Sequence, residues 1–577
     1  MAKKPKIIVI GGGLAGLMTT IQICENGGEV DLFSVVPVKR SHSVCAQGGI
    51  NAAKNTKGEG DSTDKHFDDT IYGGDFLANQ ELPRKMCEAA PGIIDLLDRM
   101  GVMFNRTPEG NIDLRRFGGT LYHRTAFAGA TTGQQMLYAL DEQVRRFESE
   151  GKVTKYEMWE LMSLVMDEAK TVRGIVALNL YSMELQSFAA DSVVLATGGC
   201  GLVFGRSTNS TACTGSAASI AYQNGAYYAN AEFIQVHPTA IPGEDKNRLM
   251  SESARGEGGR VWTYKEGKPW YFLEEWYPKY GNLVPRDVAS RAIFKVVKEL
   301  GLGVDGKDVV YLDLSHIDSK TLDIKLGGIL EIYEKFVGDD PRKVPMKIFP
   351  SVHYSMGGIW IDTNHMTNIP GLFAVGEVDY AYHGGNRLGA NSLLSCIFGG
   401  RVAGPSSLNY AKGLEGKSPG SEIFDREVKK QESIHENLFS AEDGENPFKL
   451  HEELGRLMTD NVSVLRYNKN LEKTDAELQK LLERYQHISL SDTSRGANPV
   501  LPFARELYNM LHLARAITIG ALNRNESRGA HYKPDFPERN DKDFLKTSKM
   551  KYHPDRPMIE WEDVDQRWIK PRPRKYD

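Results

Sequence analysis

Five basic side chains stand in short turns bracketed by glycine or proline, and their types suit the binding of an anion. The arginines are Arg255 in SESARGEGG, Arg286 in PRD and Arg387 in NRLGANSL, and the histidines are His237 in QVHPT and His353 in HYSMGG. Singly, each is more typical of a structural or surface residue, since an exposed ion pair contributes little. Together they favour a site for a carboxylate substrate, because the planar guanidinium fork matches a carboxylate with two parallel hydrogen bonds.

A further candidate is His42, which lies between two serines in the segment RSHSVCAQGG at 40–49. This segment follows, one strand later, a glycine-rich turn with the sequence GGGLAG at 11–16. A dinucleotide whose pyrophosphate sits at such a turn would extend its reactive ring toward His42. We therefore interpret His42 as the residue that carries a flavin as a covalent adduct, with a dicarboxylate pocket built against that ring.

The glycine-rich turn stands in the strand–turn–helix context that dinucleotide binding requires. Residues 6–10 have a buried-strand pattern, residues 17–26 a helical one, and residues 30–34 form the next strand. Gly11, Gly13 and Gly16 therefore predict a pyrophosphate site at a helix N-terminus. The second strand ends in Ser34 rather than in the acidic residue that usually binds ribose. We expect the adenosine contacts to differ from the common pattern.

The whole chain predicts an α/β protein with a Rossmann-like FAD-binding domain, an inserted α+β capping domain, a helical domain and a C-terminal tail. Helices are expected over 80–100 and 130–150, a loop over 54–75, strands of the nucleotide-binding sheet at 191–199 and 371–377, and helices over about 420–525. His237 is placed at the end of a strand, because Pro238 follows it. We assign residues 1–240 and 351–415 to the FAD-binding domain, 241–350 to the capping domain, 416–540 to the helical domain and 541–577 to the C-terminal segment.

Composition excludes several classes of function. The chain of 577 residues is too long for one core, and its formal net charge of -5 argues against nucleic acid as a partner. It has no apolar run of about 20 residues that would span a bilayer, and its start lacks the long apolar stretch of a signal peptide, so we expect a cytoplasmic protein. The six cysteines show no metal-binding or haem-attachment spacing. We expect no metal here, so that any one-electron carriers belong to partners.

Several segments in fixed order resemble the flavoprotein subunit of succinate dehydrogenases and fumarate reductases, and the resemblance covers nearly the whole chain. They are GGGLAG (11–16), RSHSVCAQGG (40–49), FGG (117–119), QVHPT (235–239), SESARGEGG (251–259), PRD (285–287), HYSMGG (353–358), NRLGANSL (386–393) and ESRGAHYKPDFPERND (526–541). The S-H-S and H-P-T segments are the most diagnostic. The pattern looks most like the quinone-linked enzymes whose membrane anchor is a single dihaem subunit.

The resemblance implies FAD as the cofactor, bonded through its 8α-methyl group to His42. The glycines of the turn would cradle the pyrophosphate, and Glu377 would hold the FAD ribose. Ser392 and Leu393 would direct the amides of a helix N-terminus at flavin N1 and O2, where reduction places negative charge. The expected cofactor contacts are completed by Ser41, Gln47, Gly48 and Gly49 along the isoalloxazine, and by Ser34 and Arg387.

The same resemblance implies hydride transfer between succinate and flavin N5. The two carboxylates of succinate or fumarate would be held by His237, Ser251, His353 and Arg387, with Phe117 packed beside substrate and flavin and Glu252 bordering the pocket. Arg286 would exchange the proton on carbon, with Glu252 and Arg255 as the relay to solvent. Because the free pKa of arginine is above about 12, a neutral His237 is the alternative base.

Two departures and three alternatives accompany this interpretation. Ser251 stands where relatives often have threonine, and Ser216 where many carry an aspartate near FAD, so we do not assign Ser216 as a ligand. A physiological fumarate reductase would use the same groups in reverse. An L-aspartate oxidase would hold FAD without the covalent histidine. A non-catalytic flavin scaffold would be favoured by loss of Arg286 or His353, and both are present.

The resemblance also implies partner subunits. An iron–sulfur subunit would accept the electrons, and a membrane anchor with haem b would pass them to quinone. The chain would then lie peripherally on the cytoplasmic face of the cell membrane. The polar helical region and the basic end KPRPRK at 570–575 are candidate docking surfaces.

Overall fold

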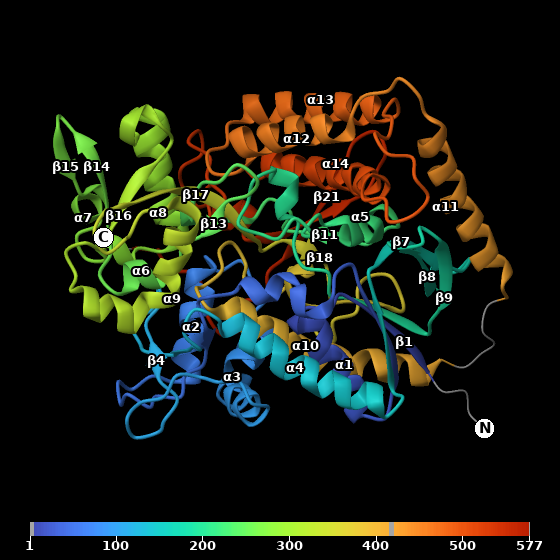
Figure 1. The fold of residues 1–577 in the computed structure, drawn as a ribbon, viewed down its shortest axis with the longest axis horizontal. Helices are drawn as coiled ribbons and strands as arrows, with labels where there is room; N and C mark the ends of the chain where they lie inside the picture. The colour runs from blue at the N-terminus through green and yellow to red at the C-terminus, as the bar shows by residue number, and fades with distance from the viewer. Residues whose placement is uncertain (1–4, 415–419, 576–577) are drawn as a thin grey trace.

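The computed structural model describes residues 5–414 and 420–575. The domain boundary expected at 415–416, the first four residues and the last two therefore lie outside the described residues. Figure 1 shows the capping elements at one end of the molecule, the helices α11–α14 along one side and the nucleotide-binding sheet toward the other end. The α/β class with capping and helical parts is confirmed.

A five-stranded parallel sheet carries the nucleotide-binding half. Its strand order is β19–β10–β1–β2–β6, and Val9 of β1 pairs with Leu32 of β2 and Val194 of β10. The strands are β1 (Lys6–Ile10), β2 (Glu29–Ser34), β6 (Val153–Glu157), β10 (Ser192–Leu195) and β19 (Leu372–Ala374). α1 (Leu14–Glu25) and α10 (Asn391–Gly413) pack against this sheet and against each other. β1 and β10, in the middle of the sheet, are nearly continuous apolar runs and are almost fully buried.

The loop expected over 54–75 is wrong in its second half, where α2 (Thr63–Gly73) forms. The Ser62 side chain accepts the backbone N–H of Lys65, which caps this helix. His66, Phe67 and Ile71 are buried along one side, so the polar residues occupy the exposed side of an amphipathic helix. The helices expected over 80–100 and 130–150 are confirmed as α3 (Glu81–Arg99) and α4 (Thr132–Ser149).

Smaller sheets extend this half of the molecule. One consists of β3 (Ile50–Asn51), β5 (Thr125–Ala126) and β4 (Leu114–Arg115), and another of β7 (Trp159–Met166), β8 (Val172–Asn179) and β9 (Leu185–Ala189). α5 (Ser216–Gln223) packs against β7 and α14. These elements bring Trp159–Leu161 and Cys213–Ala217 to the cavity beside the glycine-rich turn.

The capping part has its own sheet and its own hydrophobic core. The sheet order is β13–β12–β17–β16–β14–β15, and the buried core residues run from Ile241 to Ile348. The strands are β12 (Ile234–Ile241), β13 (Arg248–Leu249), β14 (Arg260–Lys265), β15 (Lys268–Trp270), β16 (Val310–Asp313) and β17 (Met346–Ser355), and the helices are α6 (Ser253–Gly256), α7 (Phe272–Trp276), α8 (Arg286–Phe294) and α9 (Ser319–Val337).

His237 does not end a strand, contrary to the expectation. β12 continues through Pro238 to Ile241 and pairs with β17 across register shifts on both sides of His237. Proline lacks a donor for the ladder, and a bulge is where a strand accommodates it. These register shifts interrupt the regular strand pairing on both sides of His237.

The helical part lies over the nucleotide-binding half and confirms the helices expected after 420. It contains α11 (Glu422–Ser440), α12 (Pro447–Val462), α13 (Asn468–Tyr485) and α14 (Val500–Asn523). The length of α14 and the burial of most of its residues identify it as the central helix of this part. Among the described residues, no helix combines the length and the apolar character that crossing a membrane would need.

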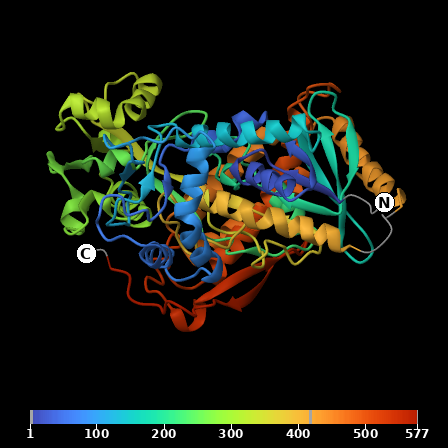
Figure 2. The same ribbon diagram turned by 90° about the horizontal axis from the view of Figure 1, so that it is seen from below.

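The polar C-terminal segment forms more structure than a tail. After α15 (Asp541–Phe544), β20 (Lys546–Lys551) and β21 (Met558–Asp563) form a hairpin that joins β11 (Tyr228–Ala229) and β18 (Gly358–Ile359) in one sheet. Figure 2 shows this segment, in red, running along one side of the molecule toward the capping part. Near its end, Arg574 pairs with Asp287 of α8 at 2.6 Å, and the Tyr72 hydroxyl of α2 accepts the backbone N–H of Lys575 at 2.8 Å.

Candidate functional site

The glycine-rich turn forms a cradle that side chains would fill. Gly11 has φ +119°, and a Cβ there would lie 2.1 Å from the Ala196 carbonyl oxygen. Gly16 lies behind the turn, where a Cβ would be 1.8 Å from the Gly11 oxygen. The turn passes directly into α1, whose first amide, that of Leu14, donates to the Ser43 hydroxyl at 3.2 Å. Because the turn has no side chains in the way, a pyrophosphate can come close to the N-terminus of α1, which favours negative charge.

Two connected cavities lie beside this turn. The first, of about 160 Å³, is lined by Gly11–Gly13, Ser34 and Ser41. The second, of about 480 Å³, is lined by Gln47, Gly48, Gly49, Phe117, Ser392 and Leu393. His42, Ser43, Glu377 and Cys396 line both. The continuous space suits a dinucleotide whose pyrophosphate lies in the first cavity and whose ring lies in the second, so the residues present fit FAD.

His42 stands at the junction of the two cavities in a 3-10 turn, His42–Cys45. Its Nδ1 accepts the backbone N–H of Ser210 at 3.1 Å, and the Asn209 amide nitrogen lies 3.2 Å from Nε2. Burial lowers the pKa of His42 to about 4, with Lys246 as a further cause, so the ring is neutral. Because a backbone amide can only donate, Nδ1 carries no proton, and Nε2 is the nitrogen that would bear a substituent in place of its contact with Asn209.

The rim of the second cavity is fixed by buried polar contacts. Arg115, which the sequence reasoning missed, donates through Nε to the Gly48 carbonyl at 3.1 Å. A Cβ at Gly48 would lie 2.8 Å from the Phe117 ring, so only glycine admits that ring. Asn391 begins α10, and its Oδ1 accepts from Asn51 at 2.8 Å. Ser392 and Leu393 therefore present the first turn of a long helix to the cavity, where it favours negative charge.

Glu377 lies where the two cavities meet. One of its carboxylate oxygens accepts the backbone N–H of Ser355 at 2.9 Å. Burial raises the pKa of Glu377 to about 7, and the Ser355 amide and Arg387 oppose that rise. Because Glu377 lines both cavities, it is placed to contact the part of FAD between the adenosine and the isoalloxazine.

Glu252 joins two arginines in one buried ion cluster. Arg286 donates through Nε to Glu252 Oε2 at 2.8 Å, and Arg255 Nη2 lies 3.2 Å from Oε1. Burial acts to raise the pKa of Glu252, but Arg286 and Arg255 outweigh it and leave that pKa below its ordinary value. Arg286 and Glu252 line the second cavity, whereas Arg255 lies behind them and donates to the Asn282 carbonyl at 2.8 Å. Arg286, Glu252 and Arg255, the residues expected to exchange and relay the proton, are thus in contact one after another.

Arg286 occupies the first position of α8, where Pro285 precedes it. Its Nη1 donates to the Gln235 Oε1 at 3.0 Å, and Gln235 donates in turn to the Arg387 carbonyl at 2.8 Å. Gln235 belongs to the QVHPT segment, and its side chain is fully buried beside these arginines. Sequence reasoning assigned it no role, although its place two residues before His237 on a strand puts both side chains on one face.

The two histidines form a pair at the cavity wall, with ring centroids 5.0 Å apart. His237 Nδ1 accepts the backbone N–H of Thr239 at 3.3 Å, and its buried Nε2 has no partner among the described residues. His353 Nδ1 lies 2.7 Å from the Thr208 hydroxyl. Burial, and then Arg286, lower the pKa of both histidines well below the ordinary value. Both rings are neutral, and His237 Nε2–H is a donor available to a ligand.

Arg387 lies in the turn before α10, with its guanidinium carbon 4.4 Å from the Tyr354 ring centroid. Burial, and then Arg286, lower the pKa of Arg387 to about 9, and its Nε has no partner in the described part of the chain. Ser251 is 2 % exposed and lines the same cavity. The cavity thus presents two arginines and two neutral histidines, an arrangement that suits a small dicarboxylate.

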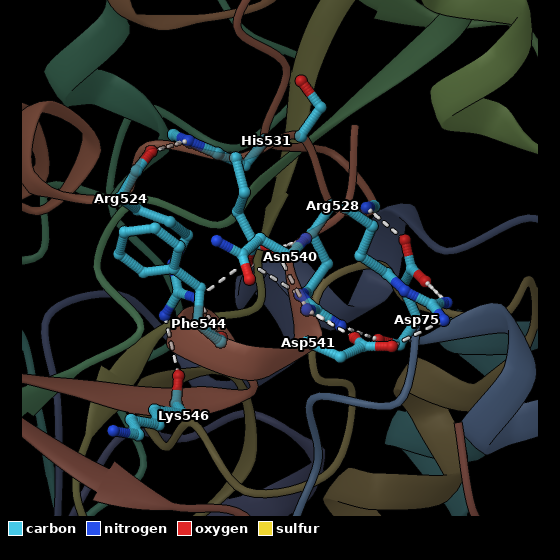
Figure 3. Close-up of polar contacts among 12 residues, drawn as sticks. Asp75, Arg524, Arg528, His531, Asn540, Asp541, Phe544 and Lys546 are labelled. Carbon is cyan, nitrogen blue, oxygen red and sulfur yellow. Dashed lines mark hydrogen bonds and ion pairs between the residues drawn. The ribbon is translucent and has the colours of Figure 1, made fainter. Parts of the chain in front are cut away.

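A buried ionic network holds the turn that carries Arg387. Arg528 donates to the Asp75 carbonyl at 2.8 Å and pairs with Asp541 at 2.8 Å, as Figure 3 shows. The backbone next to Arg528 continues this contact, because Ala530 N–H donates to the Gly385 carbonyl at 2.9 Å. The C-terminal region therefore fixes the backbone two residues before Arg387.

Most of the expected site residues meet around these two cavities, and two do not line them. Ser34 and Ser41 line only the first cavity, and Gly16 and Arg255 line neither. Residues that the sequence reasoning left out line them as well: Glu160, Ser216 and Glu506 in the first, and Thr208, Lys246, Arg248 and Tyr354 in the second. Among the described residues, no group of histidine, cysteine or acidic side chains is arranged to hold a metal ion.

Comparisons with known proteins agree with this geometry. Residues 6–393 match the family described as "FAD binding domain", and residues 451–576 match "Fumarate reductase flavoprotein C-term". The chain is 66% identical over 574 residues to the succinate dehydrogenase flavoprotein subunit of Bacillus subtilis, covering 99% of this chain and 98% of that one. It is 34% identical over 586 residues to the fumarate reductase flavoprotein subunit of Escherichia coli, covering 99% and 95%.

Solved structures show the same likeness. A chain of "Quinol-Fumarate Reductase with Menaquinol Molecules" superposes with a TM-score of 0.91 at 34% identity, covering 99% of each chain. A chain of "Mycobacterium smegmatis Sdh1 in complex with UQ1" superposes with a TM-score of 0.86 at 31% identity, covering 97% of this chain and 94% of that one.

Proposed function

This chain belongs to the family of flavoprotein subunits of succinate dehydrogenases and fumarate reductases, and on that premise we propose that it interconverts succinate and fumarate in its second cavity. It is an FAD-binding oxidoreductase of this class. The observation that carries the proposal is the single cavity in which Arg286, Arg387, His237 and His353 face the segment His42–Gly49.

The proposed mechanism assigns binding to one set of side chains. Arg387 and His353 hold one carboxylate, and His237 and Ser251 hold the other. His237, Ser251 and Arg387 are buried and His353 is partly buried, so the hydrogen bonds to the carboxylates form in a low-dielectric site, where they are strong. Pinning both ends of a four-carbon diacid fixes its central carbons, and such orientation lowers the barrier. FAD, when bound, supplies a ring that accepts or donates hydride.

The proton on the adjacent carbon passes through Arg286 in this proposal. Arg286 is held by Gln235 and Glu252, so its remaining N–H groups keep a fixed direction. Glu252 and Arg255 behind it form the path along which the proton moves away from the cavity. His237 is the alternative base only in the tautomer whose Nε2 carries no proton, and the hydrogen bond from the Thr239 N–H to Nδ1 disfavours that tautomer. Either direction of the reaction uses the same groups, and comparison of both rates on intact membranes would decide which one operates.

We also propose that His42 bonds to FAD through Nε2. The Ser210 amide occupies Nδ1, and the low pKa keeps the ring unprotonated. A covalent bond would tie the cofactor at the junction of the two cavities.

The test is a denaturing gel of the native protein, viewed under ultraviolet light after acid. A fluorescent band at the mass of the chain, 64.3 kDa, is expected for the wild type, and a dark band for His42→Ser. His123→Ser is the matched control, because His123 is a partly exposed histidine that lines neither cavity. A wild-type band without fluorescence would contradict the covalent bond. Retained yellow colour in native His42→Ser would still support FAD binding.

The partners follow from the family. We propose that an iron–sulfur subunit accepts the electrons and that a membrane anchor with haem b and quinone, of the single dihaem type, receives them next. The chain would lie on the cytoplasmic face of the membrane through these subunits. The relatives bear the names fumarate reductase and quinol-fumarate reductase, which supports a quinone-linked assembly.

A further inference from the structure

Two glutamates line the first cavity and have no part in the mechanism above. Glu160 is the second residue of β7, and Glu506 lies in the first half of α14. Glu160 is 5 % exposed. The Thr214 hydroxyl donates to Glu506 Oε1 at 3.5 Å. Two acidic side chains from separate parts of the fold thus meet at one wall of a cofactor cavity.

The position of this wall relative to the cofactor follows from the nucleotide fold. The first cavity also contains Gly11–Gly13 and Ser34, at the end of β2. In such folds, the end of the second strand lies beside the adenosine ribose, and an acidic residue there accepts its hydroxyl protons. Here the Ser34 hydroxyl is engaged with the Val36 carbonyl at 2.6 Å. The hydrogen-bond acceptors for the ribose must therefore come from other residues. Apart from Glu377, the carboxylates that line this cavity are those of Glu160 and Glu506.

The surroundings of Glu160 and Glu506 suit the two uncharged hydroxyl groups of a ribose. Burial raises the pKa of both carboxyls, and the neighbouring Glu506 raises the pKa of Glu160 further. Arg505, the charged neighbour on α14, directs Nη2 to the Gln431 side chain at 2.6 Å. The pair thus retains a proton near neutral pH and offers both a donor and acceptors, which is the set that ribose hydroxyls require.

A separate observation shows that this cavity awaits a polar ligand. Ser41 also lines it, is 9 % exposed, and its hydroxyl has no hydrogen-bond partner among the described residues. Buried hydroxyls are normally paired, so an unpaired one in a cavity points to a ligand that completes it.

We infer that Glu160 and Glu506 bind the ribose hydroxyls of the adenosine half of FAD, in place of an acidic residue at the end of β2 and of Glu377, to which the resemblance assigns the ribose. The inference rests on the FAD-binding function proposed above, and it names the residues that recognise the half of the cofactor remote from the chemistry.

The test compares FAD with its 2′-deoxyadenosine analogue, which lacks one ribose hydroxyl. The full chain with His42→Ala serves as parent, so that binding is reversible and is read from flavin fluorescence. The parent should bind FAD about tenfold more tightly than the analogue, the size expected for one hydrogen bond to a buried carboxyl. Glu160→Met and Glu506→Met should each weaken FAD binding and abolish this preference. Glu472→Met, at an exposed glutamate of α13, should change neither value.

Two results would overturn the inference. One is a parent that binds both ligands equally. The other is a pair of methionine variants that keep the preference while losing affinity for both ligands, since that marks a structural role. A parent that binds neither ligand, together with wild-type protein without flavin, would instead refute FAD binding itself. Should a methionine variant be poorly folded, Glu160→Gln and Glu506→Gln, compared in the same way, decide between the two outcomes.

Discussion

Arg286 is oriented before any substrate binds. The carboxylate of Glu252 and the amide oxygen of Gln235 hold two sides of its guanidinium group, and the start of α8 fixes its backbone. A planar fork with several donors can satisfy both partners and still present an N–H to the cavity. A lysine ammonium is a point charge on a flexible stem and cannot hold this geometry.

We therefore expect Arg286→Lys to lose turnover by at least about a hundredfold, the usual size of a lost acid–base group. Its FAD content should equal that of the wild type, because Arg286 lies in the substrate cavity rather than at the glycine-rich turn. Rates with succinate and with fumarate, normalised to flavin, provide the measurement. Arg145→Lys, at an exposed arginine of α4, is the control for the substitution itself. Full turnover in Arg286→Lys would exclude Arg286 from proton transfer.

Asp379 is a buried acid near the cofactor cavities whose protonation is linked to stability. Its Oδ1 accepts the Ala381 N–H at 2.9 Å, while Oδ2 has no hydrogen-bond partner among the described residues. Burial raises the pKa of Asp379 to about 8 from 3.8. The folded protein therefore binds a proton between these values that the unfolded chain releases, so its stability falls as pH rises through that window.

Asp379→Asn should remove this dependence, because the amide imitates the protonated acid. The free energy of unfolding of the variant, relative to wild type, should rise between about pH 5 and about pH 8, with a slope of at most about 1.4 kcal/mol per pH unit. Thermal unfolding of both proteins across that range provides the measurement. A constant difference would show that Asp379 is ionised throughout.

At the scale of elements, the C-terminal segment fastens the capping part to the nucleotide-binding part. Arg574 pairs with Asp287 on α8, and the Lys575 backbone binds Tyr72 on α2. Asp287 is 1 % exposed in its side chain and also pairs with Arg291 at 3.4 Å. Because α8 begins with Arg286, this contact also bears on the position of Arg286 at the second cavity.

Arg574→Gln should leave Asp287 with only one cationic partner in a buried place. We expect a loss of up to about 3 kcal/mol, the low end for a broken buried pair, because Arg291 remains. The double variant Arg574→Gln with Asp287→Asn should recover part of that loss. Melting temperatures of the four proteins in this cycle provide the measurement. Additive single effects would argue that the pair is not coupled.

Elements with strong periodic patterns were predictable, and those set by tertiary contacts were not. The strand at 6–10, its glycine turn and the helices α3 and α4 follow from local sequence. The helix α2 escaped detection because its buried side includes His66 and Thr70, which read as polar in isolation. The pairing of Gln235 with Arg286, and of Glu160 with Glu506, joins distant segments, and a single sequence carries no signal of such contacts.

At the scale of the whole molecule, the described residues include no group of side chains arranged to hold a metal ion. We expect the isolated full chain to oxidise succinate with a soluble phenazine dye as acceptor. Quinone reduction should require the iron–sulfur and anchor subunits. Assays with both acceptors, on the lone chain and on the assembled complex, provide the measurement. A lone chain that reduces quinone at the rate of the complex would contradict the proposed assembly.

The hairpin β20–β21 adds its strands to β11 and β18, which come from the first half and the middle of the chain. A ribosome delivers the N-terminal residues first, and domains generally fold as they emerge. Here the sheet beside the nucleotide-binding half stays incomplete until translation has nearly finished. A prematurely truncated product would leave β11 without its partner strand β20, so we expect stable folding of this region only in the finished polypeptide.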